Sequence, residues 1–330
     1  MPLSDRPTAA YITSLRQHLM EVWSRTWADW EKRDQYYFQT YALWPSGLKG
    51  RPEYHPGRSR QIVDSAVDHQ LAFEPIPHRF PAGKGEQHEL RADTTEQYLK
   101  AVFDEAALLE NILTWKAVGK NLIHLGYAVV EGPVLDMWER PKKPVKRKDE
   151  SEQEYEDRLV LWENEKKTWM PFRIRVPHPA RVLLDPERKP PRFAIKHDLW
   201  YSQTLYELTS KRKGWRRRDV AVWEVGDNPF ATVMCDDYWT KDWHALMAVD
   251  GGGGDYKWNG SSNHEDFLFI ERNPWGFVPF DHAFAGWGQE PTQEDQKDPK
   301  YQAAGILTPV IETLHLQAQA MAGQHNALIE

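Results

Sequence analysis

The hydrophobic period of this chain changes near Phe172, and that change narrows the folds it can adopt. Before Phe172, apolar residues recur every three or four positions over long stretches, which is the spacing of one helix face. After it, they alternate over short stretches, which is typical of strands. Long helices followed by short strands predict an α+β fold with a largely antiparallel sheet.

Three amphipathic helices are predicted before residue 130, and they cover residues 8–38, 61–73 and 94–126. The first carries an aromatic stripe that includes Trp23 and Trp30. The third starts with the T-x-x-Q sequence of Thr94 and Gln97, which fits a capping box, and we expect it to end at Gly126.

Residues 139–169 interrupt this pattern with a segment that is dense in both charges. A basic, Pro-rich loop leads into a helix that starts with a second capping box, Ser151 and Glu154. The simplest interpretation is a solvated insertion with one docked edge.

Short strands are predicted on both sides of this insertion. They cover residues 127–130, 172–176, 182–184, 193–199, 220–225, 231–238, 245–249 and 267–271, with a helix near residues 202–212. The glycine run at 250–254 fits a hairpin tip. Residues 273–280 are predicted to form a turn and a short extended piece.

The last segment, residues 306–330, predicts the start of a long helix. Its apolar or small residues are spaced alternately by four and three positions, as a seam between packed helices requires. No Gly, Asn or Pro ends the pattern, so we expect a helix that loses order or belongs to a longer chain. The seam residues are Leu307, Ile311, Leu314, Ala318, Met321, His325 and Leu328.

Charge and cysteine content exclude several classes of protein. The net charge of −7 argues against a general nucleic-acid coat, because nonspecific duplex binding depends on neutralising phosphates. The single cysteine, Cys235, excludes an internal disulfide and is predicted to be a small buried side chain. No signal-peptide core and no 18-residue apolar run occurs, so we expect a soluble protein without membrane contact.

No catalytic motif is present, and we predict no enzyme activity, no cofactor and no metal. The adjacent carboxylates Asp236 and Asp237 lie in a predicted strand, where neighbouring side chains point to opposite faces. They are therefore poorly placed to hold one ion. The group of His264, Glu265 and Asp266 is the other weak candidate for a metal site.

One basic cluster is a candidate site for binding nucleic acid. It places six cations in eight positions around a glycine and a tryptophan, and its members are Lys211, Arg212, Lys213, Trp215, Arg216, Arg217 and Arg218. Cations at a helix C-terminus favour the macrodipole, which is a purely structural explanation. The alternative is a loop that contacts phosphates, with Trp215 as a stacking platform.

Several short motifs follow one another along the chain, at residues 58–68, 112–130, 175–186, 236–243 (DDYWTKDW), 273–280 (NPWGFVPF) and 305–314 (GILTPVIETL). Their order resembles the N-terminal part of a tailed-bacteriophage portal protein. In that family a Tyr-Trp strand, a turn and a long helix lead from a wing domain into a stem. The resemblance implies an arm at 1–57, a wing-like α+β domain at 58–300 with the charged insertion at 139–169, and the start of a stem-like helix at 301–330.

The resemblance also implies a function at one vertex of a phage capsid. Portal subunits form a homo-oligomeric ring of twelve at that vertex, through which double-stranded DNA is packaged and ejected. Such rings are virion components, assembled in the host cytoplasm. They dock the terminase, the major capsid or scaffold protein, and the head-completion or adaptor protein. The seam of the last helix is then expected to be a subunit interface.

Two other functions remain open from the sequence. The sixteen tryptophans and several carboxylates would suit a Trp-rich carbohydrate-binding or glycan-processing protein. The shared helical face of Trp23, Trp27 and Trp30 argues for packing instead, since sugar platforms usually project from strands or loops. An adaptor or scaffold without DNA passage is the third interpretation.

Overall fold

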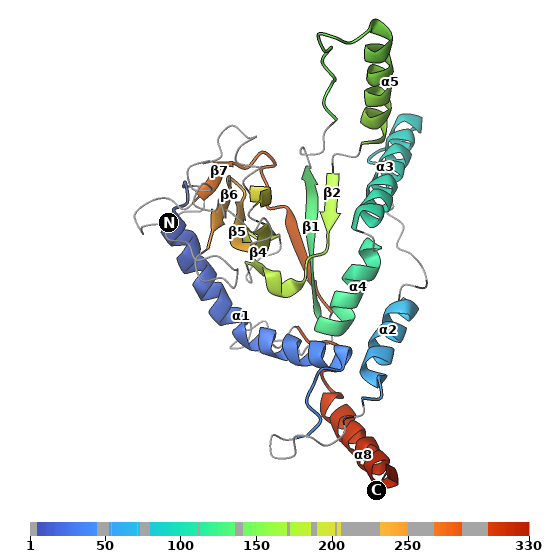
Figure 1. The fold of residues 1–330 in the computed structure, drawn as a ribbon, viewed down its shortest axis with the longest axis vertical. Helices are drawn as coiled ribbons and strands as arrows, with labels where there is room; N and C mark the ends of the chain where they lie inside the picture. The colour runs from blue at the N-terminus through green and yellow to red at the C-terminus, as the bar shows by residue number, and fades with distance from the viewer. Residues whose placement is uncertain are drawn as a thin grey trace. The chain divides into compact units, whose positions relative to one another are not determined.

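The structure is a computed structural model, and Figure 1 shows its fold. It describes residues 5–44, 53, 55–70, 72, 80–110, 113–135, 141–169, 172–185, 190–201, 203–205, 232–249, 267–285 and 303–329. Helices and antiparallel sheets confirm the predicted α+β class. The chain divides into two compact units: unit 1 holds residues 1–72, 118–129 and 177–330, and unit 2 holds residues 73–117 and 130–176.

Unit 1 is built on a five-stranded antiparallel sheet in the order β3-β4-β5-β6-β7. Its strands are β3 (Val182–Leu184), β4 (Phe193–Tyr201), β5 (Thr232–Thr240), β6 (Trp243–Ala248) and β7 (Phe267–Arg272). Strands β4 and β5 pair along their whole length, from Phe193 opposite Thr240 to Tyr201 opposite Thr232. Each of these strands was predicted from its period-two pattern.

Helix α1 (Ala9–Phe38) supplies the apolar layer that packs on this sheet. Its predicted aromatic stripe is buried: Trp23 and Trp30 are 2% and 1% exposed. Both rings contact Tyr127 at the start of strand β1 (Tyr127–Leu135), with centroid distances of 5.0 and 5.8 Å. The aromatic stripe is therefore a core-packing surface.

The long helix predicted over residues 94–126 is wrong in its start and in its continuity. The structure has two helices instead, α3 (Glu86–Glu110) and α4 (Thr114–Leu125). Thr94 lies inside α3, where its hydroxyl donates to the Leu90 carbonyl at 2.7 Å and caps nothing. The sequence T-x-x-Q does not by itself mark a helix start, because a threonine inside a helix can bond back to the preceding turn.

Gly126 ends helix α4, as predicted. Its φ of +77° is left-handed, and its N–H donates to the Leu122 carbonyl at 3.0 Å. A Cβ at this position would lie 2.4 Å from the backbone of Ala304. Glycine is thus required both by the conformation and by the close approach of a second segment.

Two further elements belong to unit 1. Helix α2 (Arg58–Gln70), predicted at 61–73, packs on α1. Strand β8 (Phe280–Phe284) pairs beside β1, and the N–H of Ala285 donates to the Gly126 carbonyl at 3.0 Å. Strand β8 was missed, because the segment before it was given only as a turn and an extended piece.

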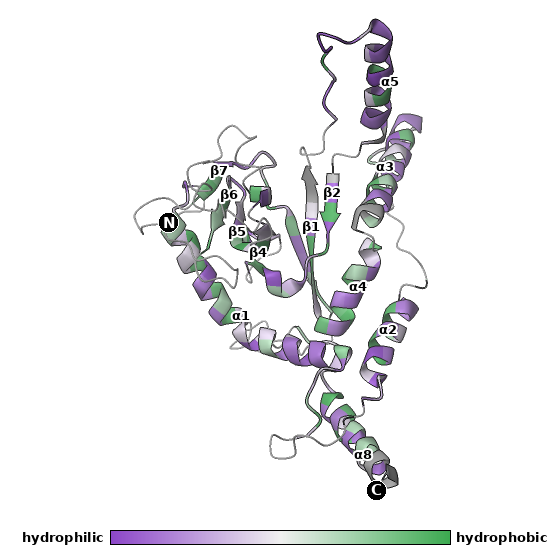
Figure 2. Cartoon of the chain, viewed as in Figure 1, coloured by the Kyte–Doolittle hydropathy of each residue, from purple (hydrophilic) through white to green (hydrophobic). Residues whose placement is uncertain are grey.

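Unit 2 pairs strand β2 (Phe172–Arg175) antiparallel to the later part of β1, with α3 packed on β2. Val102 of α3 and Ile174 of β2 are buried together. Unit 2 also contains helix α5 (Glu152–Thr168), where the predicted capping box of Ser151 and Glu154 is confirmed. Figure 2 shows α5 as mostly hydrophilic, with an apolar band near its middle.

Some predictions fall on residues outside the described part of the chain. They are the strand at 220–225, most of the helix at 202–212 and the glycine run at 250–254. Within the described residues, no helix combines the length and the apolar content needed to cross a bilayer.

Candidate functional site

Helix α8 (Ile311–Ile329) is preceded by residues 303–310, which we call the root of α8. The root lies against the end of helix α4. The N–H of Ile306 donates to the Ile123 carbonyl at 2.8 Å. A Cβ on Gly305 would lie only 2.0 Å from the His124 carbonyl oxygen. The two segments therefore meet backbone to backbone, which fixes the point from which α8 starts.

Arg33 of helix α1 contacts both the end of α4 and the root of α8. Its Nη1 donates to the carbonyl of Leu125 at 2.7 Å and to that of Ala303 at 2.8 Å, and Trp30 Nε1 donates to Leu125 at 2.9 Å. The side chain is 3% exposed. Burial lowers the pKa of Arg33, while two nearby carboxylates act in the opposite direction. The guanidinium satisfies backbone carbonyls where the end of α4 and the root of α8 leave them unpaired.

Asp34 lies beside this junction and contacts two histidines. Its carboxylate oxygens are 2.8 Å from His124 Nε2 and 3.7 Å from His178 Nε2. Burial raises the pKa of Asp34, but the hydrogen bonds from His124 and His178 outweigh it, so the pKa lies well below its ordinary value. Asp34 is thus held as an anion next to the buried Arg33.

The inner face of α8 packs on its own chain. Leu307, Ile311, Ala318 and Ala322 are buried in one cluster with Tyr36, Tyr41, Leu43 and Val63. Two polar contacts accompany this packing. Gln319 Nε2 donates to the Leu43 carbonyl at 2.9 Å, and the Tyr36 hydroxyl lies 2.8 Å from His315 Nδ1.

The residues of the predicted seam divide into three groups. Leu307, Ile311 and Ala318 are buried within unit 1, so their packing partners belong to the same chain. Leu314 and Met321 are half-buried. The side chains of His325 and Leu328 lie outside the described part. The subunit interface itself stays a prediction, and the buried residues show that the seam pattern first serves packing inside the chain.

The outer face of α8 was not singled out from the sequence. Leu316 is 65% exposed there, and Thr313 and Ala320 are exposed on the same side. A Cβ on Gly323 would meet nothing within 4 Å. The sequence does contain a sign of this exposed apolar face, because Leu316 is an apolar residue that lies outside the four-and-three spacing of the seam.

The predicted nucleic-acid cluster falls outside the described part of the chain. None of Lys211, Arg212, Lys213, Trp215, Arg216, Arg217 and Arg218 is described, so their contact with phosphates stays a prediction. The same holds for the His264, Glu265 and Asp266 group.

Asp236 and Asp237 face opposite sides of strand β5, as expected from the strand period. Asp236 pairs with His197 and lies 3.5 Å from Arg16 Nε, whereas Asp237 pairs with His244 at 2.8 Å. Each carboxylate thus has its own histidine. Across the described residues, no three His, Cys, Asp or Glu side chains gather as a metal site.

Cys235 is 0% exposed, as predicted, and burial raises the pKa of its thiol well above the ordinary value. A thiol in this state is a packing group, since the reactive form of cysteine is the thiolate.

The pair of His244 and Asp237 predicts a pH dependence of stability. Burial lowers the pKa of His244, but the Asp237 charge and hydrogen bond outweigh it, so the pKa is raised. Such a histidine stabilises the fold fully below its unfolded pKa of about 6.5, and the contribution is lost as pH rises through the folded pKa. We expect the thermal midpoint to fall as pH rises above about 6.5.

The matched variants are His244→Gln and His18→Gln, the second at an exposed position on α1. His244→Gln should flatten the pH dependence of the thermal midpoint, measured by circular dichroism from acid to mildly alkaline pH. His18→Gln should leave it as in the parent protein. An unchanged slope in His244→Gln would contradict the assignment.

The sequence of the chain matches no family model, and no curated protein matches it.

Proposed function

We propose that this chain is a portal subunit of a tailed bacteriophage, in which α8 is the start of the stem. In this proposal identical subunits form a ring at one capsid vertex, and double-stranded DNA passes through it during packaging and ejection. The ring would also dock the terminase, the capsid or scaffold protein and the head-completion protein. The subunit needs no catalytic residue for this function.

The observation that carries the proposal is that α8 packs on its own chain along one face and is exposed along the other. The inner face and the root of the helix are fixed to unit 1 by buried apolar residues and by Arg33, whereas Leu316 on the outer face is 65% exposed. A helix held on one side and open on the other can pack against the same helix of a neighbouring subunit. Head-to-tail contacts between identical subunits close into rings when the rotation allows it.

The order of elements also supports the proposal. Strand β5 carries the Tyr238 and Trp239 pair, the turn around Asn273 follows, and α8 comes last, in the order that the portal resemblance requires. Asn273 holds that turn, because its Nδ2 donates to the carbonyls of Thr240 and Phe277 at 2.6 and 2.7 Å.

The distribution of tryptophans speaks against the carbohydrate alternative. Among the tryptophan side chains that the structure describes, none is exposed. Trp23, Trp30 and Trp239 are buried in the core of unit 1. A sugar platform needs an accessible ring face, and the buried rings of Trp23, Trp30 and Trp239 lack one.

Leu316→Asp is the variant that tests the proposed stem contact. Burying a leucine side chain contributes about 2 kcal/mol, and a carboxylate at that place would also be desolvated. We expect association between subunits to weaken by at least about tenfold, measured by sedimentation velocity. Leu314→Asp is unsuitable, because Leu314 packs in the cluster of its own chain.

Leu199→Asp is the matched control, since Leu199 is 48% exposed on strand β4 of the same unit. Both variants should keep the thermal midpoint of the parent, because both side chains are exposed. Normal association of Leu316→Asp, or an equal loss in both variants, would contradict a stem contact through this face.

A further inference from the structure

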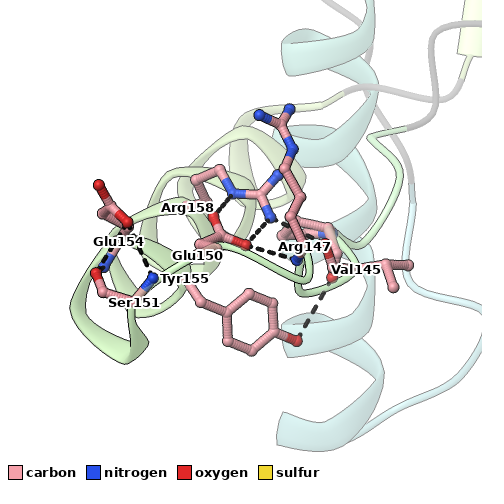
Figure 3. Close-up of polar contacts among 8 residues, drawn as sticks. Val145, Arg147, Glu150, Ser151, Glu154, Tyr155 and Arg158 are labelled. Carbon is pink, nitrogen blue, oxygen red and sulfur yellow. Dashed lines mark hydrogen bonds and ion pairs between the residues drawn. The ribbon is translucent and has the colours of Figure 1, made fainter.

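A basic strap, residues 141–148, lies along one face of helix α5 in unit 2 (Figure 3). Three helix side chains hold the strap through its backbone carbonyls. The hydrogen bonds run from Trp162 Nε1 to Pro141 at 3.1 Å, from Arg158 Nη2 to Val145 at 2.9 Å and from the Tyr155 hydroxyl to Pro144 at 3.5 Å. Because these donors sit on one helix face, the strap follows the helix axis.

The turn between strap and helix is closed by the Glu150 carboxylate. It accepts the Arg147 backbone N–H at 2.9 Å and Arg158 Nη2 at 2.7 Å. These donors, the backbone N–H first, hold the pKa of Glu150 below its ordinary value. The capping box of Ser151 and Glu154 follows at once. The backbone of the strap is therefore held in place on the helix.

The side chains of the strap face solvent. Its five cations, Lys142, Lys143, Lys146, Arg147 and Lys148, are all exposed, and no acidic residue lies among them. Lys146 pairs with Glu152. Val145, at the centre of the strap, is 81% exposed. The strap thus presents one aliphatic side chain surrounded by positive charge.

The side of α5 away from the strap has the opposite charge. At 3.6 residues per turn, Glu156, Asp157 and Val160 lie on that side, with the exposed Lys167 as one cation among them, and Leu161 and Glu163 border it on opposite edges. The carboxylates outnumber this cation. We call Glu156, Asp157, Val160, Leu161 and Glu163 the acidic face. Val160 and Leu161 are 57% and 62% exposed. Within the described residues, the carboxylates of the acidic face make no ion pair.

We propose that the basic strap of one copy of this chain docks on the acidic face of α5 in a second copy. Val145 would pack on Val160 and Leu161, and the strap cations would pair with the surrounding carboxylates. Unit 2 carries both halves of this contact: exposed aliphatic side chains on the strap and on α5, surrounded by charges of opposite sign.

A second copy fits better than a nucleic acid. Phosphates would pair with the strap but would leave Val145 exposed, and the acidic face on the same element would repel them. A contact between copies covers the aliphatic side chains and neutralises both charges. An apolar centre within a polar rim is the usual arrangement of a protein interface.

The contact is head-to-tail, because strap and acidic face lie on different sides of the same helix. Two docked copies leave one strap and one acidic face open, so the contact can add further copies until a ring closes. Closure into a ring rests on the proposed function above, whereas the pairwise contact stands by itself.

The test uses two charge-reversed forms of the whole chain. The first is Lys142→Glu with Lys143→Glu and Lys148→Glu, which leaves two cations and three carboxylates on the strap, and the second is Glu156→Lys with Asp157→Lys. Each form presents like charges on both surfaces, so each alone should associate at least about tenfold more weakly than the parent at low salt. A 1:1 mixture should recover association, because each strap then meets a face of opposite charge. Sedimentation velocity measures all three samples.

Circular dichroism checks that both forms stay folded, as expected for exposed residues. A mixture no better than its components, or a single form that associates like the parent, would overturn the proposal. Unchanged association with loss of duplex DNA binding in the first form would also overturn it, in favour of a nucleic-acid surface. If the mixture recovers association but no closed rings form, the contact stands and the portal function is contradicted. If rings form and neither charge-reversed form affects them, the portal function stands and the contact is contradicted.

Discussion

Replacing Arg33 with Met is expected to destabilise unit 1 by about 2–4 kcal/mol. Arg33 is 3% exposed and bridges Leu125 and Ala303 through one guanidinium nitrogen. Methionine fills a similar volume but donates nothing, so the Ala303 carbonyl loses this donor in the interior. Chemical denaturation followed by circular dichroism measures the loss of free energy of unfolding.

Lys32→Met is the matched control, because Lys32 is the exposed neighbour of Arg33 on the same helix. It should change the free energy of unfolding by less than about 0.5 kcal/mol. Equal effects of the two variants would show that Arg33 does not join α1 to the root of α8.

Gly305→Ala is expected to have the second large effect, a destabilisation of about 3 kcal/mol or more. The new Cβ would lie 2.0 Å from the His124 carbonyl oxygen, and that oxygen belongs to the backbone, which cannot rotate away. Either the root of α8 moves away from α4 or the end of α4 distorts. The free energy of unfolding measures the destabilisation in either case. Faster proteolysis near residue 305 indicates that the root of α8 has moved away from α4.

Gly323→Ala is the matched control with the opposite sign. Gly323 lies within α8, where a Cβ meets nothing within 4 Å. Alanine inside a helix should therefore stabilise it by about 0.5–1 kcal/mol. Tolerance of Gly305→Ala at the level of Gly323→Ala would contradict the backbone contact at the root.

The sequence predicted the elements of the fold well where a period was long and undisturbed. Helix α1, with 30 residues, matches its predicted bounds within one residue. The prediction failed at Thr94, because a capping sequence is short and also occurs inside helices. It missed β8, because the sequence FDHAF does not alternate strictly between apolar and polar residues.

The candidate site was harder to predict, because its contacts are long-range. Arg33 donates to the Ala303 carbonyl, 270 positions away in the chain, and no local sequence pattern predicts such a bond. The four-and-three spacing of the last helix correctly marked an apolar face at Leu307, Ile311 and Ala318. A spacing cannot say whose residues cover that face, and in this structure the same chain covers these three.

Electron microscopy of negatively stained protein, purified from the complete gene, tests the central claim most directly. The proposed portal function predicts closed rings with a central opening, with the twelve subunits that the portal resemblance implies. A protein that stays monomeric under all assembly conditions, and never forms rings, would contradict it.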